Sequence, residues 1–396
     1  HEVGHTLGLR HNFKASSIYS LEQISDADFV SKHGPVGSVM DYNGINLMDG
    51  GQNFFQTKPG PYDYWAIEYA YSEQSLNSTM SEDEFLNQIA SKSTNPLYVY
   101  CTDEDAYGSK SVDPYCSSGR DLTNNPIEYF DKQLLLVNDF WSKLLDNFEN
   151  DGVRYPKIRR IFYNGLYEYF KATRSISKFI GGIEHSRHHV GETNKTPLSV
   201  IPSNEQRKAL MFLDRNIFSK NAFNFSSELL NKLAPERYSN MRRWGGARTL
   251  DLSIHNTVLQ IQRTALYKAF NPTILQRIQD NEIRMGDNQN KFTLNELFGT
   301  LATVIWKELE NNNEYVNSFR RNLQKEHLNI LVYIMLDKNN QFPNDAVAFS
   351  RDNLRKLSAK LHFSISNDSL DEYTIYHYLE CVNKIESAHQ AQTILN

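Results

Sequence analysis

The sequence predicts a mostly α-helical chain, in which a short metal-binding region is followed by an extended α-helical region. Three observations support this fold class. Residues 1–11 contain histidines at the spacing of a metal-binding helix. Beyond Tyr71, helix-capping residues repeatedly precede apolar residues at helical spacing. Residues 180–202, with two adjacent glycines, β-compatible residues and two prolines, are instead typical of a hairpin or a crossing loop.

The first eleven residues have the pattern H-E-x-x-H-x-x-G-x-x-H. At about 100° per residue, His1 and His5 share one helix face, so both imidazoles can reach one ion. Gly8 falls where the helix must end, which allows His11 to return as a third ligand. Three protein ligands leave one coordination position open, as in a catalytic zinc site, and Glu2 can serve as the base. A chance cluster or a structural metal site is the alternative, but five specified residues at fixed offsets argue against it.

This motif resembles that of the metzincin clan of zinc endopeptidases, and two later segments extend the resemblance. Ser38–Tyr42 resembles the Met-turn, which places Met40 beneath the metal. By the same resemblance, Tyr42 ligates or faces the zinc and is a candidate catalytic residue. Pro61–Tyr71 resembles the helix that closes metzincin catalytic domains. Asp63 lies in its first turn, where a carboxylate suits the free N–H groups, and we expect it to brace the Met-turn.

A closer resemblance is to a family of large, mostly bacterial, secreted zinc-dependent metalloproteases with a helical C-terminal region. The segments that carry it span most of the chain, at residues 11–16, 60–69, 102–105, 206–210 and 229–235. Asn12 differs from the Ser, Asp or Glu of the best-known metzincin branches and indicates a separate branch. The resemblance implies that residues 1–75 are the C-terminal part of an α+β zincin-like catalytic domain and that residues 76–396 are its helical extension. The N-terminal half of that domain is then expected upstream, and the protein is expected to be secreted or periplasmic.

The same resemblance implies an endopeptidase with one catalytic zinc on His1, His5 and His11, and a protein or peptide as substrate. Glu2 would act as general base toward a zinc-activated water, and Tyr42 would help to stabilise the oxyanion. Two alternatives stay open: a zinc hydrolase of a non-peptide amide, such as a cell-wall linkage, and a non-catalytic metal-binding scaffold. A net charge of −5 gives no basic footprint for nucleic acid, and the apolar runs are too short to cross a bilayer.

The region beyond Tyr71 is predicted to be helical. Three segments have the capping-box pattern, namely Ser81–Glu84, Thr293–Glu296 and Ser369–Glu372. Apolar residues at helical spacing predict further helices at residues 131–148, 159–178 and 253–270.

The three cysteines lack the spacing of a cysteine zinc site or a redox pair. Cys101 and Cys116 bracket a polar loop, and in an oxidising compartment a disulfide there would stabilise the fold by about 3 kcal/mol. Two reduced thiols are the alternative. Cys381 lies on an amphipathic segment and is predicted to be a buried thiol.

Two further clusters could bind metal. The acidic run Asp103–Asp105 offers oxygen ligands for calcium, although acidic loops are more often simply solvated. His185, His188 and His189 have no carboxylate or cysteine partner at a recognisable spacing, so we expect them to be exposed loop histidines.

Overall fold

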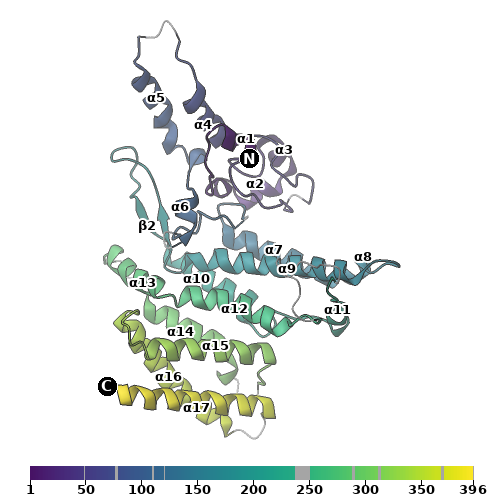
Figure 1. Ribbon diagram of the computed structural model, residues 1–396. Helices are drawn as coiled ribbons and strands as arrows, with labels where there is room; N and C mark the ends of the chain where they lie inside the picture. The colour runs from purple at the N-terminus through teal and green to yellow at the C-terminus, as the bar shows by residue number, and fades with distance from the viewer. Residues whose placement is uncertain are drawn as a thin grey trace. The chain divides into compact units, whose positions relative to one another are not determined.

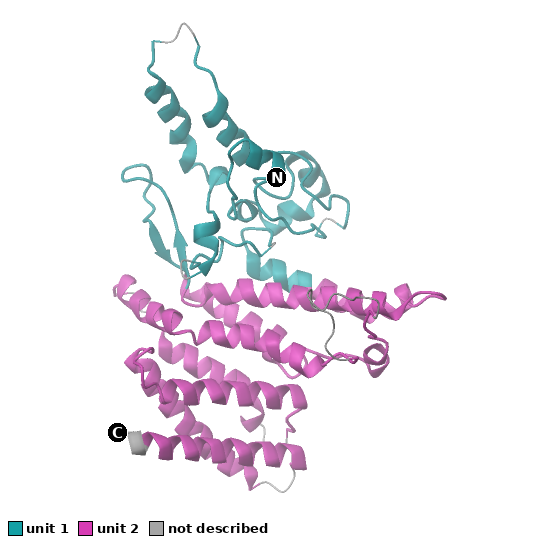
Figure 2. Ribbon diagram, in the orientation of Figure 1, with its two compact units in different colours: residues 1–133, 182–201 teal, residues 134–181, 202–396 magenta. Residues whose placement is uncertain are grey.

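The computed structural model describes residues 1–48, 50–75, 79–108, 111–119, 121–236, 250–287, 290–310, 314–366 and 370–395 (Figure 1). It divides into two compact units, unit 1 with residues 1–133 and 182–201, and unit 2 with residues 134–181 and 202–396 (Figure 2). The division falls inside helix α7 (Pro126–Ser142). The boundary predicted near residue 75 concerns the extent of a catalytic domain, which compactness does not test, so it stays a prediction.

Unit 1 consists of short helices and one small antiparallel sheet. Its helices are α1 (Glu2–Thr6), α2 (Leu21–Ser25), α3 (Ala27–His33), α4 (Pro61–Tyr71), α5 (Glu82–Ala90) and α6 (Asp103–Ala106), with 3₁₀ turns at Ala15–Ile18, Ser91–Thr94 and Pro96–Tyr98. The sheet pairs β1 (Ile183–His185) with β2 (Leu198–Val200), and Glu184 lies opposite Ser199. These are the only strands in the described part of the chain, so both the mostly α fold class and the hairpin near 180–202 are confirmed.

Helix α4 begins and ends at the residues predicted from the sequence. Pro61 occupies its first position, where no N–H donor is needed. Trp65 packs the helix against later segments of unit 1. Its ring stacks on that of Tyr98 at 5.2 Å, and its indole N–H donates to the carbonyl of Ile89 at 2.9 Å. These contacts fix the helix that carries Asp63.

Unit 2 is a stack of longer helices (Figure 2). They are α8 (Leu144–Phe148), α9 (Tyr155–Ile176), α10 (Ser203–Leu213), α11 (Ser227–Asn231), α12 (Ile254–Ala269), α13 (Pro272–Arg284), α14 (Leu294–Ile305), α15 (Ser318–Met335), α16 (Asn344–Ile365) and α17 (Glu372–Leu395), with tighter or wider turns at Ser177–Phe179, Asp214–Phe218 and Lys307–Glu310. Helix α9 packs on α12, α12 on α15, α15 on α16, and α16 on α17. Within the described residues, no helix combines the length and the apolar character needed to cross a bilayer.

The single helix predicted at residues 131–148 is wrong. The chain forms α7 up to Ser142 and then restarts as α8 at Leu144. The amide of Lys143 donates to the carbonyl of Phe140, three residues back, so the four-residue hydrogen-bond pattern is interrupted there. Apolar periodicity continues across this break, which is why the sequence pattern does not show it.

The capping boxes are only partly present. At α5 the box is complete, since Ser81 Oγ accepts from the amide of Glu84 at 3.3 Å and the Glu84 carboxylate accepts from the amide of Ser81 at 2.8 Å. At α14, Thr293 Oγ1 accepts from the amide of Glu296 at 3.2 Å, but the Glu296 carboxylate binds Arg207 instead, at 2.5 and 2.9 Å. A charged partner from another helix has replaced the local one.

The remaining helix predictions are confirmed with small shifts. Residues 159–178 correspond to α9 with its following turn, and residues 253–270 correspond to α12. The third capping box begins at Ser369, which lies outside the described residues. Asp371, just before α17, accepts the amide hydrogen of Thr374 at 3.2 Å.

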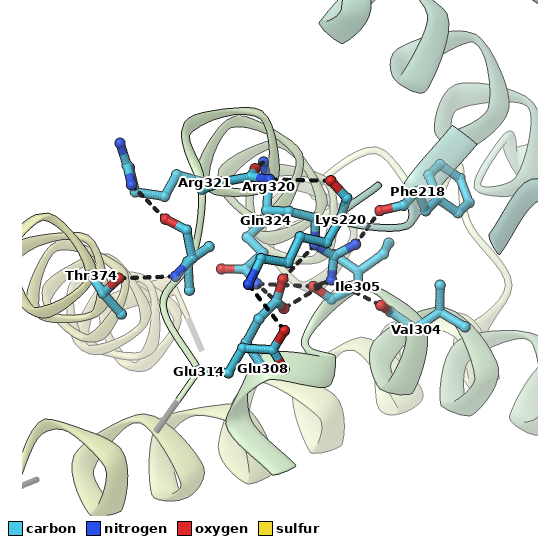
Figure 3. A network of polar contacts seen from close by, with 12 residues as sticks. Phe218, Lys220, Val304, Ile305, Glu308, Glu314, Arg320, Arg321, Gln324 and Thr374 are labelled. Carbon is cyan, nitrogen blue, oxygen red and sulfur yellow. Dashed lines mark hydrogen bonds and ion pairs between the residues drawn. The ribbon is translucent and has the colours of Figure 1, made fainter. Parts of the chain in front are cut away.

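A buried ion pair holds the end of α14 (Figure 3). The Arg320 guanidinium contacts the Glu308 carboxylate at 2.6 and 2.9 Å. It also donates to the carbonyls of Val304 at 3.0 Å and Ile305 at 2.7 Å, and to that of Phe218. The last turn of a helix has no following amides, so the carbonyls of Val304 and Ile305 need donors from elsewhere, and that of Ile305 also accepts from Gln324 Nε2 at 3.0 Å. Arg320 therefore joins α14, α15 and the turn at Asp214–Phe218.

Candidate metal centre

The three motif histidines converge in unit 1. The ring centroids of His1 and His5 lie 4.9 Å apart, those of His5 and His11 4.9 Å, and those of His1 and His11 5.3 Å. One ring nitrogen of each lies within 4.8 Å of the others, and this is the only such group of potential ligands among the described residues. Gly8 has φ of 86°, a conformation that favours glycine, and α1 ends just before it as predicted.

Each histidine uses its Nδ1 atom in a hydrogen bond. His1 contacts the carbonyl of Val39 at 2.7 Å, His5 that of Leu9 at 2.9 Å, and His11 both carboxylate oxygens of Asp103 at 2.9 Å. Carbonyl and carboxylate oxygens only accept, so each Nδ1 carries the proton and donates it. The tautomer then leaves Nε2 with a free lone pair on all three rings, which is the form that binds a metal ion. The donor set fits zinc.

The predicted Met-turn, Ser38–Tyr42, lies against helix α1. Met40 is fully buried, and a methyl group placed on Gly4 of α1 would overlap the sulfur of Met40, so this glycine permits the close approach. The amide of Asn12 donates to the Met40 carbonyl at 3.0 Å, which ties the turn to the residue after the third histidine. Helix α1, the turn and the third histidine are thus held together by contacts within unit 1.

Asp63 braces the Met-turn, as predicted. It is buried, with 4% of its surface exposed. Its carboxylate accepts from Ser38 Oγ at 2.5 Å, from the amide of Val39 at 2.8 Å and from the amide of Gly60 at 2.8 Å. The carbonyl of the same residue, Val39, receives the His1 Nδ1 proton. Asp63 therefore supports a zinc-ligand candidate through one residue of backbone.

Tyr42 and Glu2 lie beside the histidine cluster. The Tyr42 ring lies 5.3 Å from that of His1 and 4.7 Å from that of His11, and 41% of Tyr42 is exposed. Desolvation, followed by the neighbouring Tyr107, Asp103 and Glu2, raises the pKa of Tyr42 above its ordinary value, so its hydroxyl stays protonated near neutral pH.

Glu2 lies on α1 next to His1 and is exposed. Among the described residues, no hydrogen bond or ion pair engages its carboxylate. The structure thus leaves Glu2 and Tyr42 at the edge of the histidine cluster, and their chemical roles stay predictions.

The acidic run of α6 is engaged by protein groups. Asp103 contacts His11. Partial burial is the largest single influence on its pKa and acts to raise it, but the hydrogen bond and charge of His11, together with hydrogen bonds from the Asp103 amide and Thr102, lower the pKa overall. Asp105 accepts from the amide of Thr102 at 3.0 Å and pairs with Arg187 at 2.6 Å. Glu104 lies 3.3 Å from Arg187. These contacts account for the acidic run without an ion, and calcium there stays a prediction.

Asn12, next to the third histidine, has a structural role that motif reasoning missed, whereas the cysteines behave as predicted. Asn12 is completely buried and links the motif to the segment before α6, since its Nδ2 donates to the carbonyl of Val99 at 2.9 Å. Cys101 and Cys116 form the expected disulfide, with Cα atoms 6.0 Å apart, and Cys381 is a buried free thiol as predicted. The departure of Asn12 from the usual pattern was visible in the sequence, but its hydrogen-bond partner could not be predicted because it lies 87 residues away.

The three hairpin histidines do not join the cluster, and only His189 is an exposed loop histidine as predicted. His185 ends strand β1 and, like His188, is half-buried. His188 Nδ1 contacts Thr193 Oγ1 at 2.8 Å, and His189 contacts Glu192 at 3.1 Å with 87% of its side chain exposed. The backbone amide of His185 donates to Asp113 at 3.2 Å. None of the three belongs to a metal-ligand group in the described residues.

Comparison with known proteins gives one match. A sequence-family model described as Met-zincin matches residues 1–313, which is about four-fifths of the 396-residue chain. The matched range contains the histidine cluster, the turn around Met40, Asp63 and α6. No curated protein and no solved structure gives a significant match.

Proposed function

Because the chain belongs to the Met-zincin family, we propose that it is a zinc-dependent endopeptidase with His1, His5 and His11 as metal ligands. The family implies a zinc metallopeptidase. The observation that carries the finer proposal is the tautomeric state of the three rings, whose Nδ1 atoms are all engaged and whose Nε2 atoms are all available. Three imidazole ligands, with no fourth protein ligand beside them among the described residues, are typical of a catalytic rather than a structural zinc site.

The proposed chemistry assigns distinct roles to two residues. Zinc bound here would polarise a water and the scissile carbonyl. The uncommitted carboxylate of Glu2 accepts the proton of the attacking water and returns it to the leaving amine. The protonated hydroxyl of Tyr42 donates a hydrogen bond to the oxyanion that forms on the substrate carbonyl.

Replacing Glu2 by glutamine tests the proposal. Glu2→Gln removes the base but no ligand, so full-length protein should retain one zinc while its peptide turnover falls by at least about a hundredfold. Glu22→Gln, a change of the same chemistry at an exposed position of α2, is the matched control and should keep normal turnover. Zinc content is measured by elemental analysis, and turnover by mass spectrometry of a digested peptide library. Near-normal turnover in Glu2→Gln would contradict the mechanism.

The same peptide library, assayed alongside cell-wall fragments, separates the alternatives. A non-catalytic scaffold cleaves nothing with zinc bound. A hydrolase of non-peptide amides releases products from cell-wall fragments but not from peptides. The proposal requires cleavage within peptides that zinc chelation abolishes.

The proposed location is secreted or periplasmic. The Cys101–Cys116 disulfide supports it, because such bonds persist in oxidising compartments. When the protein is alkylated directly upon cell lysis, neither Cys101 nor Cys116 should react with the reagent, because both are in the disulfide. Free thiols at both positions would argue for a reducing compartment.

A further inference from the structure

We propose that Asp103 is a positioning residue that sets the orientation and the donor strength of His11 as a metal ligand. This inference rests on the zinc centre proposed above. The other two histidines donate to main-chain carbonyls, whereas His11 alone donates to a charged side chain. The centre therefore depends at one ligand on a residue that lies 92 positions away in the sequence.

The hydrogen bond between the side chains of His11 and Asp103 is short and bifurcated. His11 Nδ1 lies 2.9 Å from Asp103 Oδ1 and 2.9 Å from Oδ2, and only 16% of the His11 side chain is exposed. A carboxylate on Nδ1 fixes the ring plane and increases electron density at Nε2. The ligand then needs neither to reorient nor to change tautomer when it binds a cation.

Asp103 is itself held in place by the segment that follows His11. The backbone of Phe13, two residues after His11, lies between the two cysteine segments: its amide donates to the carbonyl of Cys101 at 2.9 Å, and its carbonyl accepts from the amide of Ser117 at 3.1 Å. The disulfide between Cys101 and Cys116 joins these segments covalently. The start of α6, and with it Asp103, is therefore clamped to the chain that carries His11.

A second support comes from the hairpin loop. Arg187 pairs with Asp105 at 2.6 Å and with Glu104 at 3.3 Å, and its guanidinium lies over the Tyr100 ring at 5.2 Å. The pair with Asp105, whose side chain is 17% exposed, holds the short helix α6 and keeps the carboxylate of Asp103 directed at His11, whereas Glu104 is 52% exposed and its longer contact contributes little. Charged pairs with an aromatic platform keep a guanidinium ordered better than an isolated surface pair does.

The test measures zinc affinity rather than activity. Full-length protein, Asp103→Ala and Asp103→Asn are compared by competition with a chromophoric chelator. We expect Asp103→Ala to weaken zinc binding by about tenfold to a hundredfold. Asp103→Asn should weaken it less, because the amide oxygen still accepts from His11 but without charge. Glu104→Gln is the matched control, since Glu104 shares the helix and the Arg187 contact but does not contact His11, and its affinity should stay within about threefold.

A double-mutant cycle distinguishes positioning from a general structural effect. If Asp103 acts through His11, Asp103→Ala should have no effect on zinc affinity in protein that already carries His11→Ala. The Co²⁺-substituted protein provides a second measure, because a misoriented imidazole alters the visible absorption bands in Asp103→Ala but not in Glu104→Gln.

The outcomes separate this inference from the proposed function. Zinc affinity of Asp103→Ala within about twofold of the parent, or an equal loss in the His11→Ala background, overturns the positioning role while leaving the zinc centre intact. A parent protein that binds no zinc overturns both. Circular dichroism of the zinc-free variants checks the fold, and Asp103→Asn, which keeps the side-chain volume, provides the comparison if Asp103→Ala does not fold.

Discussion

Removing the carboxylate of Asp63 should loosen the Met-turn. The side chain is buried and accepts three hydrogen bonds, from Ser38 Oγ, the Val39 amide and the Gly60 amide. Hydrogen bonds to a charged group contribute about 1.5–3 kcal/mol each. Three of them set an upper limit of about 5–9 kcal/mol, and relaxation with water entry reduces this, so we expect Asp63→Ala to cost about 3–5 kcal/mol.

Asp63→Asn should cost less, about 1–2 kcal/mol, because its amide oxygen can still accept from the two backbone amides. Since the chain has two compact units, global melting can follow unit 2, and the appropriate assay is hydrogen exchange of the peptides containing Val39 and Gly60. A loss of 3–5 kcal/mol corresponds to exchange that is about a hundredfold to a few thousandfold faster.

The control for Asp63 is Asp83→Asn, at an exposed carboxylate in the first turn of α5, which should lose at most the helix-dipole interaction of about 0.3–1 kcal/mol. Zinc affinity should fall together with protection in Asp63→Ala, because Val39 also accepts the His1 proton. Unchanged exchange at Val39 in Asp63→Ala would refute the bracing role.

Four further predictions concern other parts of the molecule. Burial lowers the pKa of His327 to about 3, from an ordinary value of 6.5. Below pH 6.5, His327 therefore binds a proton in the unfolded chain but stays neutral in the folded chain. The free energy of unfolding is then highest above pH 6.5 and decreases as the pH falls, by about 2 kcal/mol at pH 5. Urea unfolding at pH 5 and above pH 6.5 should show this loss, and His327→Gln should reduce the dependence of stability on pH. Replacing Cys101 and Cys116 by serine should destabilise unit 1 by about 3 kcal/mol, from the 15-residue separation, and exchange in α6 should rise without a change in unit 2. Arg320→Met should cost about 3–5 kcal/mol in urea unfolding, because it leaves Glu308 buried and unpaired, and adding Glu308→Leu should restore much of the loss. Tyr42→Phe should lower kcat about tenfold to a thousandfold with little change in KM, and an unchanged kcat would leave Tyr42 as a packing residue.

The parts of the molecule that the sequence predicts are those specified locally. The histidine spacing, the left-handed Gly8, the bounds of α4 and the role of Asp63 all depend on periodicity, capping or a recognisable motif within a few dozen residues. The disulfide was predictable because its two cysteines bracket one short loop.

The interactions that the sequence does not predict join distant segments. The acidic run at α6 is indistinguishable from a solvated loop until folding brings Asp103 to His11. Glu296 has the spacing of a capping box, yet Arg207 from another helix offers a charged partner that a backbone amide cannot match. The break between α7 and α8 leaves no trace in the apolar pattern. At Asp103 and Glu296, tertiary competition decides among local options of similar free energy.

The closed loop between Cys101 and Cys116 has a consequence for proteolysis of the chain. Loop tips with polar residues are the usual places for nicking. A single cut in the polar stretch after α6 would leave both new ends attached, one through the main chain of residue 101 and the other through the sulfur of Cys116. Without the disulfide, the same cut would leave the piece that carries His11 and Asp103 held to the residues after the cut by non-covalent contacts alone, such as the hydrogen bond from the Ser117 amide to the Phe13 carbonyl.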